Sequence, residues 1–181
     1  MMKILLTILL VFIFVDAWAT DQDPDVLYYQ GNKHYLYTSS AVNSPLESFT
    51  QLKKKLQSVN KDWMSSGCWR NFTAEWAIEG GQLYLTKVTN CKDGKEINSL
   101  VEKAINKKFV DGKMKADWVN GVYWIGSGER YWNAFENEIK FTFQNGAVVR
   151  TKHFASPDCS YSDKDTLKSF IYSNINWEEL P

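Results

Sequence analysis

The sequence predicts an α+β domain, mainly antiparallel β-sheet built from hairpins, with about three helices that cover one side. Residues 113–154 concentrate aromatic side chains in β-favouring runs, and glycines interrupt these runs where turns or bulges are expected. Residues 25–38 and 72–91 form further strand-like runs around short turn motifs. Elsewhere, apolar residues recur at three- and four-residue steps, which is the spacing of an amphipathic helix.

Residues 1–19 have the pattern of a signal peptide. Lys3 precedes the apolar run of residues 4–15, and small residues occupy the positions that signal peptidase recognises at its cleavage site. The apolar run is shorter than the roughly 20 residues that span a bilayer, although an uncleaved anchor is the alternative. We expect cleavage near Thr20, no later membrane segment, and a single domain over residues 20–181 in the periplasm or outside the cell.

The overall charge of the chain is balanced. Lysine and arginine together number 21, and so do aspartate and glutamate. A neutral chain lacks the net field that attracts nucleic acid, an anionic membrane or an acidic substrate. We therefore expect no nucleic-acid partner.

The three cysteines, Cys68, Cys91 and Cys159, are an odd number for an exported chain, which indicates one disulfide and one free thiol. A two-residue turn between the flanking strands sets Arg70 opposite Cys91, two residues from Cys68. A small departure from ladder geometry brings Cys68 and Cys91 within disulfide reach, and Cys159 is the competing partner.

Two hairpins are predicted in the first half of the domain, each with a two-residue turn. Gly31-Asn32 forms the first turn and places Leu27 opposite Leu36. A Gly-Gly pair forms the second turn and places Trp76 opposite Leu85.

The third hairpin, near its Asn-Gly pair, admits two registers. A two-residue turn pairs Phe143 with Val148, whereas a three-residue turn with Gly146 left-handed pairs Phe143 with Ala147. The three-residue turn places the apolar side chains of both strands on one face. Because a one-residue slip exchanges the faces, burial favours the three-residue turn.

Helices are predicted at three places. Ser44 and Glu47 form a capping box with a proline between them, which predicts a helix over residues 45–58. Residues 97–105 repeat apolar side chains over about three turns and form the second helix. A last helix begins after Ser162 or Asp165.

Metal and cofactor chemistry have no recognisable motif. His34 and His153 are isolated and match no metal-ligating spacing, so we expect no metal, no cofactor and no catalytic residues. A pair of carboxylates is the signature of a glycoside hydrolase, and four acidic side chains lie among the aromatic runs: Asp117, Glu129, Glu136 and Glu138.

The surplus of aromatic side chains is the best sign of a binding site. Neighbours in a strand point to opposite faces, so Tyr123 and Trp124 cannot both enter one core. Aromatic and arginine side chains are enriched in protein interfaces, and aromatic rings also stack on sugars. The predicted binding residues are Trp69, Arg70, Trp118, Tyr123, Trp124, Arg130, Tyr131 and Trp132.

Six short segments come in order along the chain: PDVL at residues 24–27, SPLE at 44–47, CWRNFTAEWAI at 68–78, QLYL at 82–85, ADWVNG at 116–121 and WEELP at 177–181. In this order they resemble a family of uncharacterised exported proteins of Gram-negative bacteria. The resemblance implies a shared fold and a bacterial origin, and the family has no established activity.

The first functional hypothesis is an exported, non-enzymatic binding protein, such as an immunity or inhibitor protein that acts by protein-protein contact. The second is a glycan- or peptidoglycan-binding module that uses exposed aromatic side chains. The third is a glycoside hydrolase with an Asp/Glu pair.

Overall fold

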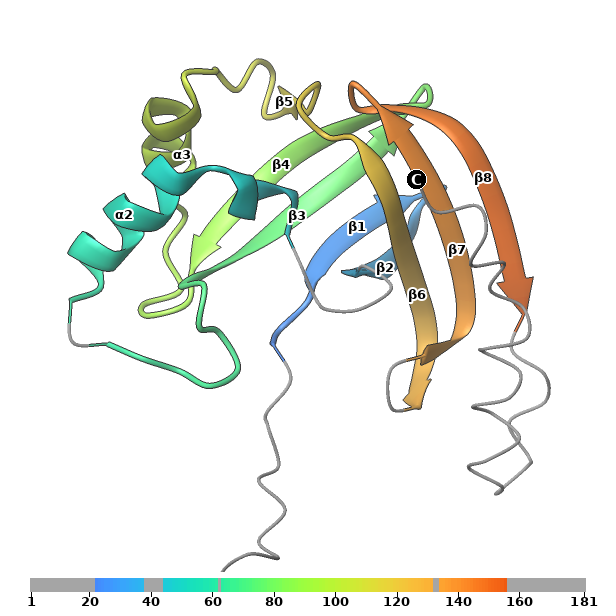
Figure 1. Cartoon of the computed structure of the whole chain (residues 1–181), viewed down its shortest axis with the longest axis horizontal. Coiled ribbons are helices and arrows are strands. Elements are labelled where there is room, and N and C mark those ends of the chain that lie inside the picture. Colours follow the sequence, from blue (N-terminus) through green and yellow to red (C-terminus); the bar gives the residue numbers. More distant parts are fainter. Residues whose placement is uncertain (1–21, 38–43, 62, 132–133, 156–181) are drawn as a thin grey trace, which may run out of the picture.

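A computed structural model describes residues 22–37, 44–61, 63–131 and 134–155, and leaves the side chains of 129–131, 134 and 155 outside its description. The predicted signal peptide, the predicted last helix and Cys159 fall outside these residues. The strands are β1 (Asp25–Tyr29), β2 (Asn32–Tyr37), β3 (Phe72–Glu79), β4 (Gln82–Asn90), β5 (Met114–Lys115), β6 (Gly121–Tyr131), β7 (Ala134–Gln144) and β8 (Ala147–Ala155). The helices are a 3-10 turn η2 (Pro45–Ser48), α2 (Thr50–Val59) and α3 (Asn98–Ile105) (Figure 1).

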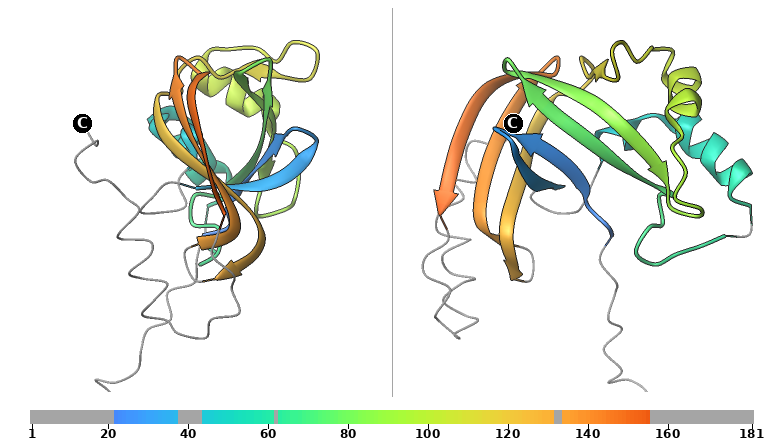
Figure 2. Two further views of the ribbon diagram at one scale, coloured as in Figure 1. Left: turned by 90° about the vertical axis from the view of Figure 1, so that its right-hand side faces the viewer. Right: turned by 180° about the vertical axis from the view of Figure 1, so that it is seen from behind.

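Seven strands close on themselves in the order β3-β1-β2-β6-β7-β8-β4, because β4 pairs with β3, and β5 adds to the other side of β4. Strand β1 runs parallel to β3, whereas the other pairings are antiparallel. Figure 2 shows the β3–β4 hairpin and strands β6–β8 meeting at one edge and diverging from it. The predicted sheet of hairpins under about three helices is therefore wrong: the fold is a closed barrel with two short α-helices in the described residues.

The barrel closes where the tips of two hairpins meet. Gln82 at the start of β4 pairs with Ala147 at the start of β8. Two backbone bonds flank this pair, from Leu83 N to Gly146 O (2.8 Å) and from Val148 N to the carbonyl of Gly81 (2.7 Å). This contact joins residues far apart in the chain, so local turn motifs do not reveal it.

The core fills the barrel and extends under the helices. Trp76 of β3 and Phe141 of β7 are the largest fully buried side chains. Leu52 and Leu56 of α2 and Val101 of α3 are also fully buried and belong to the same cluster. The two helices contact each other beside β4. They close one flank of the barrel, whereas the sequence predicted a helical layer over one side of an open sheet.

The predicted helix over residues 45–58 forms as two pieces. The capping box is present: Leu46 N donates to the Ser44 hydroxyl, and Ser44 N donates to the Glu47 carboxylate. The 3-10 turn η2 then gives way at Phe49, and α2 begins at Thr50. The second predicted helix is confirmed as α3.

The first hairpin has a register different from the predicted one. Its turn residues are Gln30 and Gly31, both with positive φ (52° and 80°), as in a type I′ turn. Leu27 consequently lies opposite His34, and the predicted pairing with Leu36 is wrong. The shift is two residues, so the same side chains still face the core.

The second hairpin confirms both the predicted register and the disulfide. Trp76 lies opposite Leu85, as predicted. A bulge between Glu75 and Trp76 then shifts the register. Cys68 and Cys91 form a disulfide, with their Cα atoms 6.5 Å apart. The departure from ladder geometry lies in the turn before β3, where Asn71 N donates to Cys68 O (3.0 Å).

The third hairpin has a two-residue turn, so the predicted three-residue turn is wrong. Phe143 pairs with Val148, and a bulge between Thr142 and Phe143 then sets Phe141 opposite Thr151. Both phenylalanines are buried. The bulge restores the burial that the longer turn was expected to supply.

Candidate functional site

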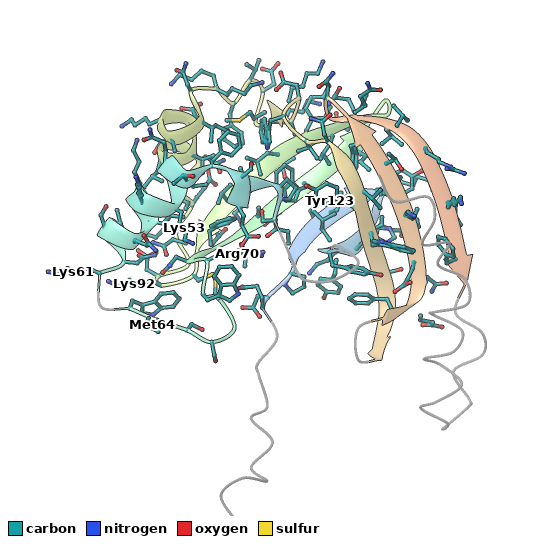
Figure 3. All side chains as sticks on the ribbon, viewed as in Figure 1. Lys53, Lys61, Met64, Arg70, Lys92 and Tyr123 are labelled. Carbon is teal, nitrogen blue, oxygen red and sulfur yellow. A yellow bond between two sulfur atoms is a disulfide. The ribbon has the colours of Figure 1, made fainter. Side chains whose placement is uncertain are left out.

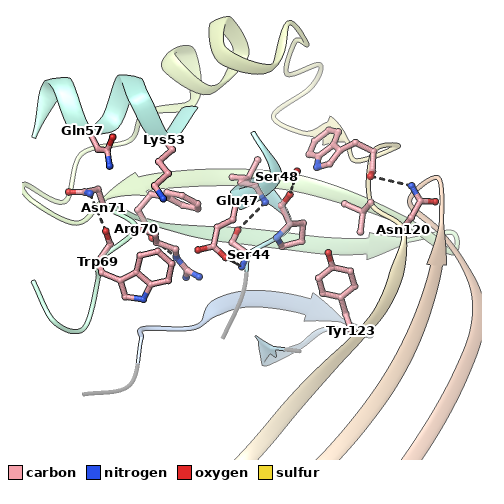
Figure 4. A pocket seen from close by; sticks show the side chains of 15 residues that line it. Ser44, Glu47, Ser48, Lys53, Gln57, Trp69, Arg70, Asn71, Asn120 and Tyr123 are labelled. Carbon is pink, nitrogen blue, oxygen red and sulfur yellow. Dashed lines mark hydrogen bonds between the residues drawn. The ribbon is translucent and has the colours of Figure 1, made fainter. Parts of the chain in front are cut away.

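A pocket of about 510 Å³ lies between the start of the helical flank, the loop before β3 and the segment before β6. Figure 4 shows the side chains that line it. Four of the eight predicted binding residues line this pocket: Trp69, Arg70, Trp118 and Tyr123. They come from three separate parts of the chain, and the barrel brings them together.

Trp69 and Arg70 are neighbours with opposite environments. Trp69 is 54% exposed to solvent, whereas Arg70 is only 5% exposed. The disulfide at Cys68 holds the loop immediately before them. An exposed ring therefore stands on a loop that is covalently tied to the barrel.

Hydrogen bonds hold the Arg70 guanidinium in one position. Its Nε donates to Phe72 O (2.9 Å), and its Nη2 donates both to Asp23 O (2.7 Å) and to Asp25 Oδ1 (2.7 Å). The Phe72 ring also lies under the guanidinium, 5.2 Å from its Cζ atom. A side chain fixed in this way loses little further freedom when a ligand binds.

Asp25 is the fully buried partner that balances the charge of Arg70. Beyond Arg70, its Oδ1 accepts from Ala74 N (3.0 Å) and its Oδ2 accepts from Trp76 Nε1 (2.9 Å). These bonds tie β1 to β3 at the parallel edge of the barrel. Asp25 therefore positions Arg70 and lies behind the wall of the pocket.

Arg70 Nη1 is buried and has no hydrogen-bond partner among the described residues. An arginine has five N–H donors, and three of them are used here. Leaving a buried donor unpaired costs about 1–3 kcal/mol. An acceptor brought by a ligand would remove this cost, so Arg70 is the strongest pointer to a ligand in the pocket.

Glu47 and Lys53 add two charged groups to the pocket lining. Burial raises the pKa of the Glu47 carboxyl above its ordinary value of 4.5, while the bond from Ser44 N and the charges of Arg70 and Lys53 oppose this rise. Burial also raises the pKa of the Tyr123 hydroxyl, and the charge of Glu47 contributes. The carboxyl and the phenol thus share a partly dry environment.

Trp118 forms the part of the wall that reaches into the core. The edge of Phe49 meets its ring at a centroid distance of 5.4 Å, and Trp76 lies 6.4 Å away. Its Nε1 is buried and has no partner among the described residues. Lys107 lies over the ring, 5.5 Å from its centroid. Trp118 is therefore mainly a structural support for the pocket.

Of the other four predicted residues, Trp124 has a described side chain, and it does not line this pocket. Trp124 packs against Phe154, with ring centroids 5.1 Å apart, and Lys140 lies over its ring. Tyr123 and Trp124 thus point to opposite faces of β6, as strand geometry predicts. Arg130 and Tyr131 lie at the end of β6, but their side chains are not described, and Trp132 lies outside the described residues.

Sequence reasoning missed Glu47, Lys53 and Asp25 as parts of the site. Glu47 was recognised only as part of a helix cap. The capping box located the Glu47 carboxylate at a helix start in the sequence. The fold then places this carboxylate close enough to Arg70 for the two charges to interact. Asp25 had no such signal, since its contact with Arg70 spans 45 residues.

Metal-binding clusters, histidines and membrane-spanning helices were the other possible signs of function in the described residues. No group of three or more His, Cys, Asp or Glu side chains is placed to hold a metal ion among them. His34 is buried in β2, where burial lowers the pKa of its imidazole, and His153 is exposed in β8. Within the same residues, none of the helices is long and apolar enough to cross a membrane.

Comparisons of the chain with protein-family models, with curated proteins and with solved structures gave no match. The resemblance to exported Gram-negative proteins therefore stays a prediction. The function has to be argued from the site.

Proposed function

We propose that this protein is an exported, non-enzymatic binding protein that takes a carbohydrate into the pocket beside Trp69 and Arg70. The observation that carries the proposal is the pairing of an exposed indole with a buried, fixed guanidinium that has an unused donor. The pocket volume of about 510 Å³ lies within the range of small-ligand sites.

The lining groups suit a saccharide for three physical reasons. A sugar presents an apolar ring face that packs on an aromatic ring such as Trp69. Its hydroxyl and ring oxygens accept hydrogen bonds, which Arg70 Nη1 and the Lys53 ammonium can donate. Its hydroxyl groups also donate, and the Glu47 carboxylate can accept. Fixed donors beside one exposed ring therefore match a ligand that is apolar on one side and polar at its edges.

The proposed place of action is the periplasm or the exterior of the cell. The Cys68–Cys91 disulfide supports a non-reducing environment. The signal-peptide pattern of residues 1–19 supports export, and the resemblance to Gram-negative proteins supports the periplasm as one destination.

A second candidate is binding to a protein partner, including the role of an immunity or inhibitor protein. The observation that favours it is the exposure of Met64 (94%) in the same loop as Trp69. Tryptophan, arginine and methionine are enriched in protein interfaces. Such a partner would insert a side chain into the pocket and cover Met64.

We do not extend the proposal to glycoside hydrolysis. That reaction needs two carboxyl groups flanking one bond, and Glu47 is the one carboxylic residue in the described pocket lining. Asp117 instead contacts Lys107, and Glu138 accepts from the Tyr37 hydroxyl and from Phe135 N.

The test is binding of oligosaccharides to the chain of residues 20–181, measured by titration calorimetry and by retention on insoluble cell wall. The variant is Trp69→Ala, and the control is Tyr28→Ala, which removes an exposed aromatic ring outside the pocket. We expect Trp69→Ala to weaken binding about tenfold or more, since loss of a stacked ring is worth at least about 1.4 kcal/mol. Tyr28→Ala should leave affinity unchanged.

Two outcomes contradict the carbohydrate proposal. One is no binding by any saccharide. The other is stoichiometric capture of a protein that Trp69→Ala loses and Tyr28→Ala keeps, which would establish the second candidate.

A further inference from the structure

Three exposed lysines gather on the pocket side of the molecule. Lys53 lies on α2 and lines the pocket, Lys61 follows α2, and Lys92 follows β4. Figure 3 shows them on the same side as Arg70 and Met64. None of the three forms an ion pair with another described residue. The chain as a whole is neutral. The fold brings these three lysines together from two separate segments, α2 with the residues after it and the residues after β4.

A buried asparagine network places these lysines next to the pocket. Asn60 and Asn90 exchange two side-chain bonds of 3.0 Å, and Asn60 Nδ2 also donates to Asn71 Oδ1 (3.3 Å). Lys92 N donates to Asn90 Oδ1 (3.0 Å), and Lys61 is the residue after Asn60. Asn71 lines the pocket, so the end of α2 and the end of β4 are held at its margin.

Two acceptors of the pocket wall are already engaged by the protein itself. The Asn71 oxygen accepts from Asn60, and the Ser44 hydroxyl accepts from Leu46 N. Arg70 Nη1, in contrast, is a charged donor with no described partner, and Lys53 adds a second cation. A ligand that pairs with both cations must present acceptor groups, and an anionic acceptor pairs with them most strongly.

Four acidic residues lie in the described part of this region, and two of them are paired with a cation. Asp25 is turned into the core, and Asp93 pairs with Lys95. Glu47 points one carboxylate oxygen at Ser44 N, and Asp23 is exposed beside Gly67. Among the described residues of this region, the three lysines without an ion pair outnumber these two remaining carboxylates.

We propose that the saccharide bound in this pocket carries a carboxylate, as the uronic acids do, and that the carboxylate lies against Arg70 Nη1 and Lys53. This inference rests on the carbohydrate proposal and narrows it to acidic sugars. A carboxylate is an acceptor-only group, and its bonds to cationic donors are shorter and stronger than neutral ones. Further acidic units of the same chain would lie near Lys61 and Lys92.

The experiment compares oligosaccharides with and without their charge. The probes are trimers of galacturonate and of alginate, together with their methyl esters, which keep the ring and remove the anion. The chain of residues 20–181 is titrated with each at about 0.02 M and about 0.5 M salt. We expect each free acid to bind at least about tenfold more tightly than its ester at low salt. We expect this ratio to shrink at high salt, because exposed lysines are screened.

Lysine variants locate the charge effect. Lys53→Gln should weaken binding of the free acids about fivefold and leave the esters unaffected. Lys54→Gln is the matched control, because Lys54 is exposed on the same helix and does not line the pocket. An equal loss in both variants would mean a general charge effect and would overturn the assigned position of the carboxylate.

The outcomes separate this inference from the carbohydrate proposal. If esters and acids bind equally and Trp69→Ala weakens both, the carbohydrate proposal stands and the acidic-sugar inference fails. If no acid and no ester binds while an acidic protein is captured, both fail and the protein-partner candidate gains support. If nothing binds, both fail.

Discussion

Asp25 and Arg70 form an ion pair of 2.7 Å in which neither side chain is more than 2% exposed. The pair joins β1 to the loop before β3, next to the one parallel strand pairing of the barrel. It also holds Arg70, which lines the pocket. We therefore expect the stability of the fold and the proposed ligand binding to depend on the same contact.

Replacing Asp25 with Asn should destabilise the protein by about 3–5 kcal/mol, because the Arg70 charge is then buried without a counter-ion. The measurement is urea unfolding followed by tryptophan fluorescence. The control is Glu75→Gln, which breaks the exposed Glu75–Lys87 pair and should cost about 0–1 kcal/mol. Similar losses in the two variants would show that Arg70 does not depend on Asp25.

The barrel closure can be tested at Gly146. A Cβ atom there would overlap the carbonyl oxygen of Ala116, and the φ of +72° is strained for any other residue. Gly81 has a similar φ of +76° and open space around its Cβ position. Gly146→Ala should therefore destabilise the protein by about 2–3 kcal/mol more than Gly81→Ala does.

Amide hydrogen exchange gives an independent reading of the same pair of variants. In Gly146→Ala, the amides of Leu83 and Val148 should lose protection, since both bond across the closure. If the two alanine variants have equal stability and equal exchange, the hairpin tips do not hold the barrel together.

The buried carboxyl of Glu47 predicts a dependence of stability on pH. Its pKa is raised in the folded state, so the folded protein holds a proton that the unfolded chain has released. Stability is therefore lost as the pH rises from about 4.5 through the folded pKa, and Glu47→Gln should remove this loss. The glutamine keeps an oxygen acceptor for Ser44 N.

Glu102 provides a control of opposite sign. The bond from Phe109 N, with the contact to Lys108, lowers the pKa of its carboxyl. Its contribution is present above the ordinary pKa and is lost as the pH falls through the folded pKa. The difference in stability between each variant and the wild type is measured by urea unfolding from pH 3 to 8. Curves of the same sign for Glu47→Gln and Glu102→Gln would contradict the assignment.

Local patterns were sufficient for several elements. The capping box at Ser44 marked a helix start, and the apolar spacing of residues 97–105 marked α3. The Gly-Gly turn set Trp76 opposite Leu85, and the turn before β3, in which Asn71 N donates to Cys68 O, accompanies the disulfide of Cys68 with Cys91. Each of these features depends on residues close together in the chain.

Registers were less secure where a bulge or a turn type decided them. At the first hairpin, the turn formed one residue earlier than predicted, at Gln30 and Gly31, because Gln30 took a positive φ. At the third hairpin, the turn has two residues, and the bulge beside Phe143 puts the apolar side chains on both sides of it on the buried face. Burial was the right criterion there, but a bulge met it as well as a longer loop would have.

The sequence by itself determined the strand-rich character, the two described helices, the disulfide and the grouping of Trp69 with Arg70. Only the tertiary structure decided that the sheet closes, that Asp25 pairs with Arg70, and which of Tyr123 and Trp124 joins Trp118 in the pocket. The physical reason is contact range. Turns, caps and helical spacing act over a few residues, whereas closure and the buried ion pair join segments whose meeting depends on how the whole core packs.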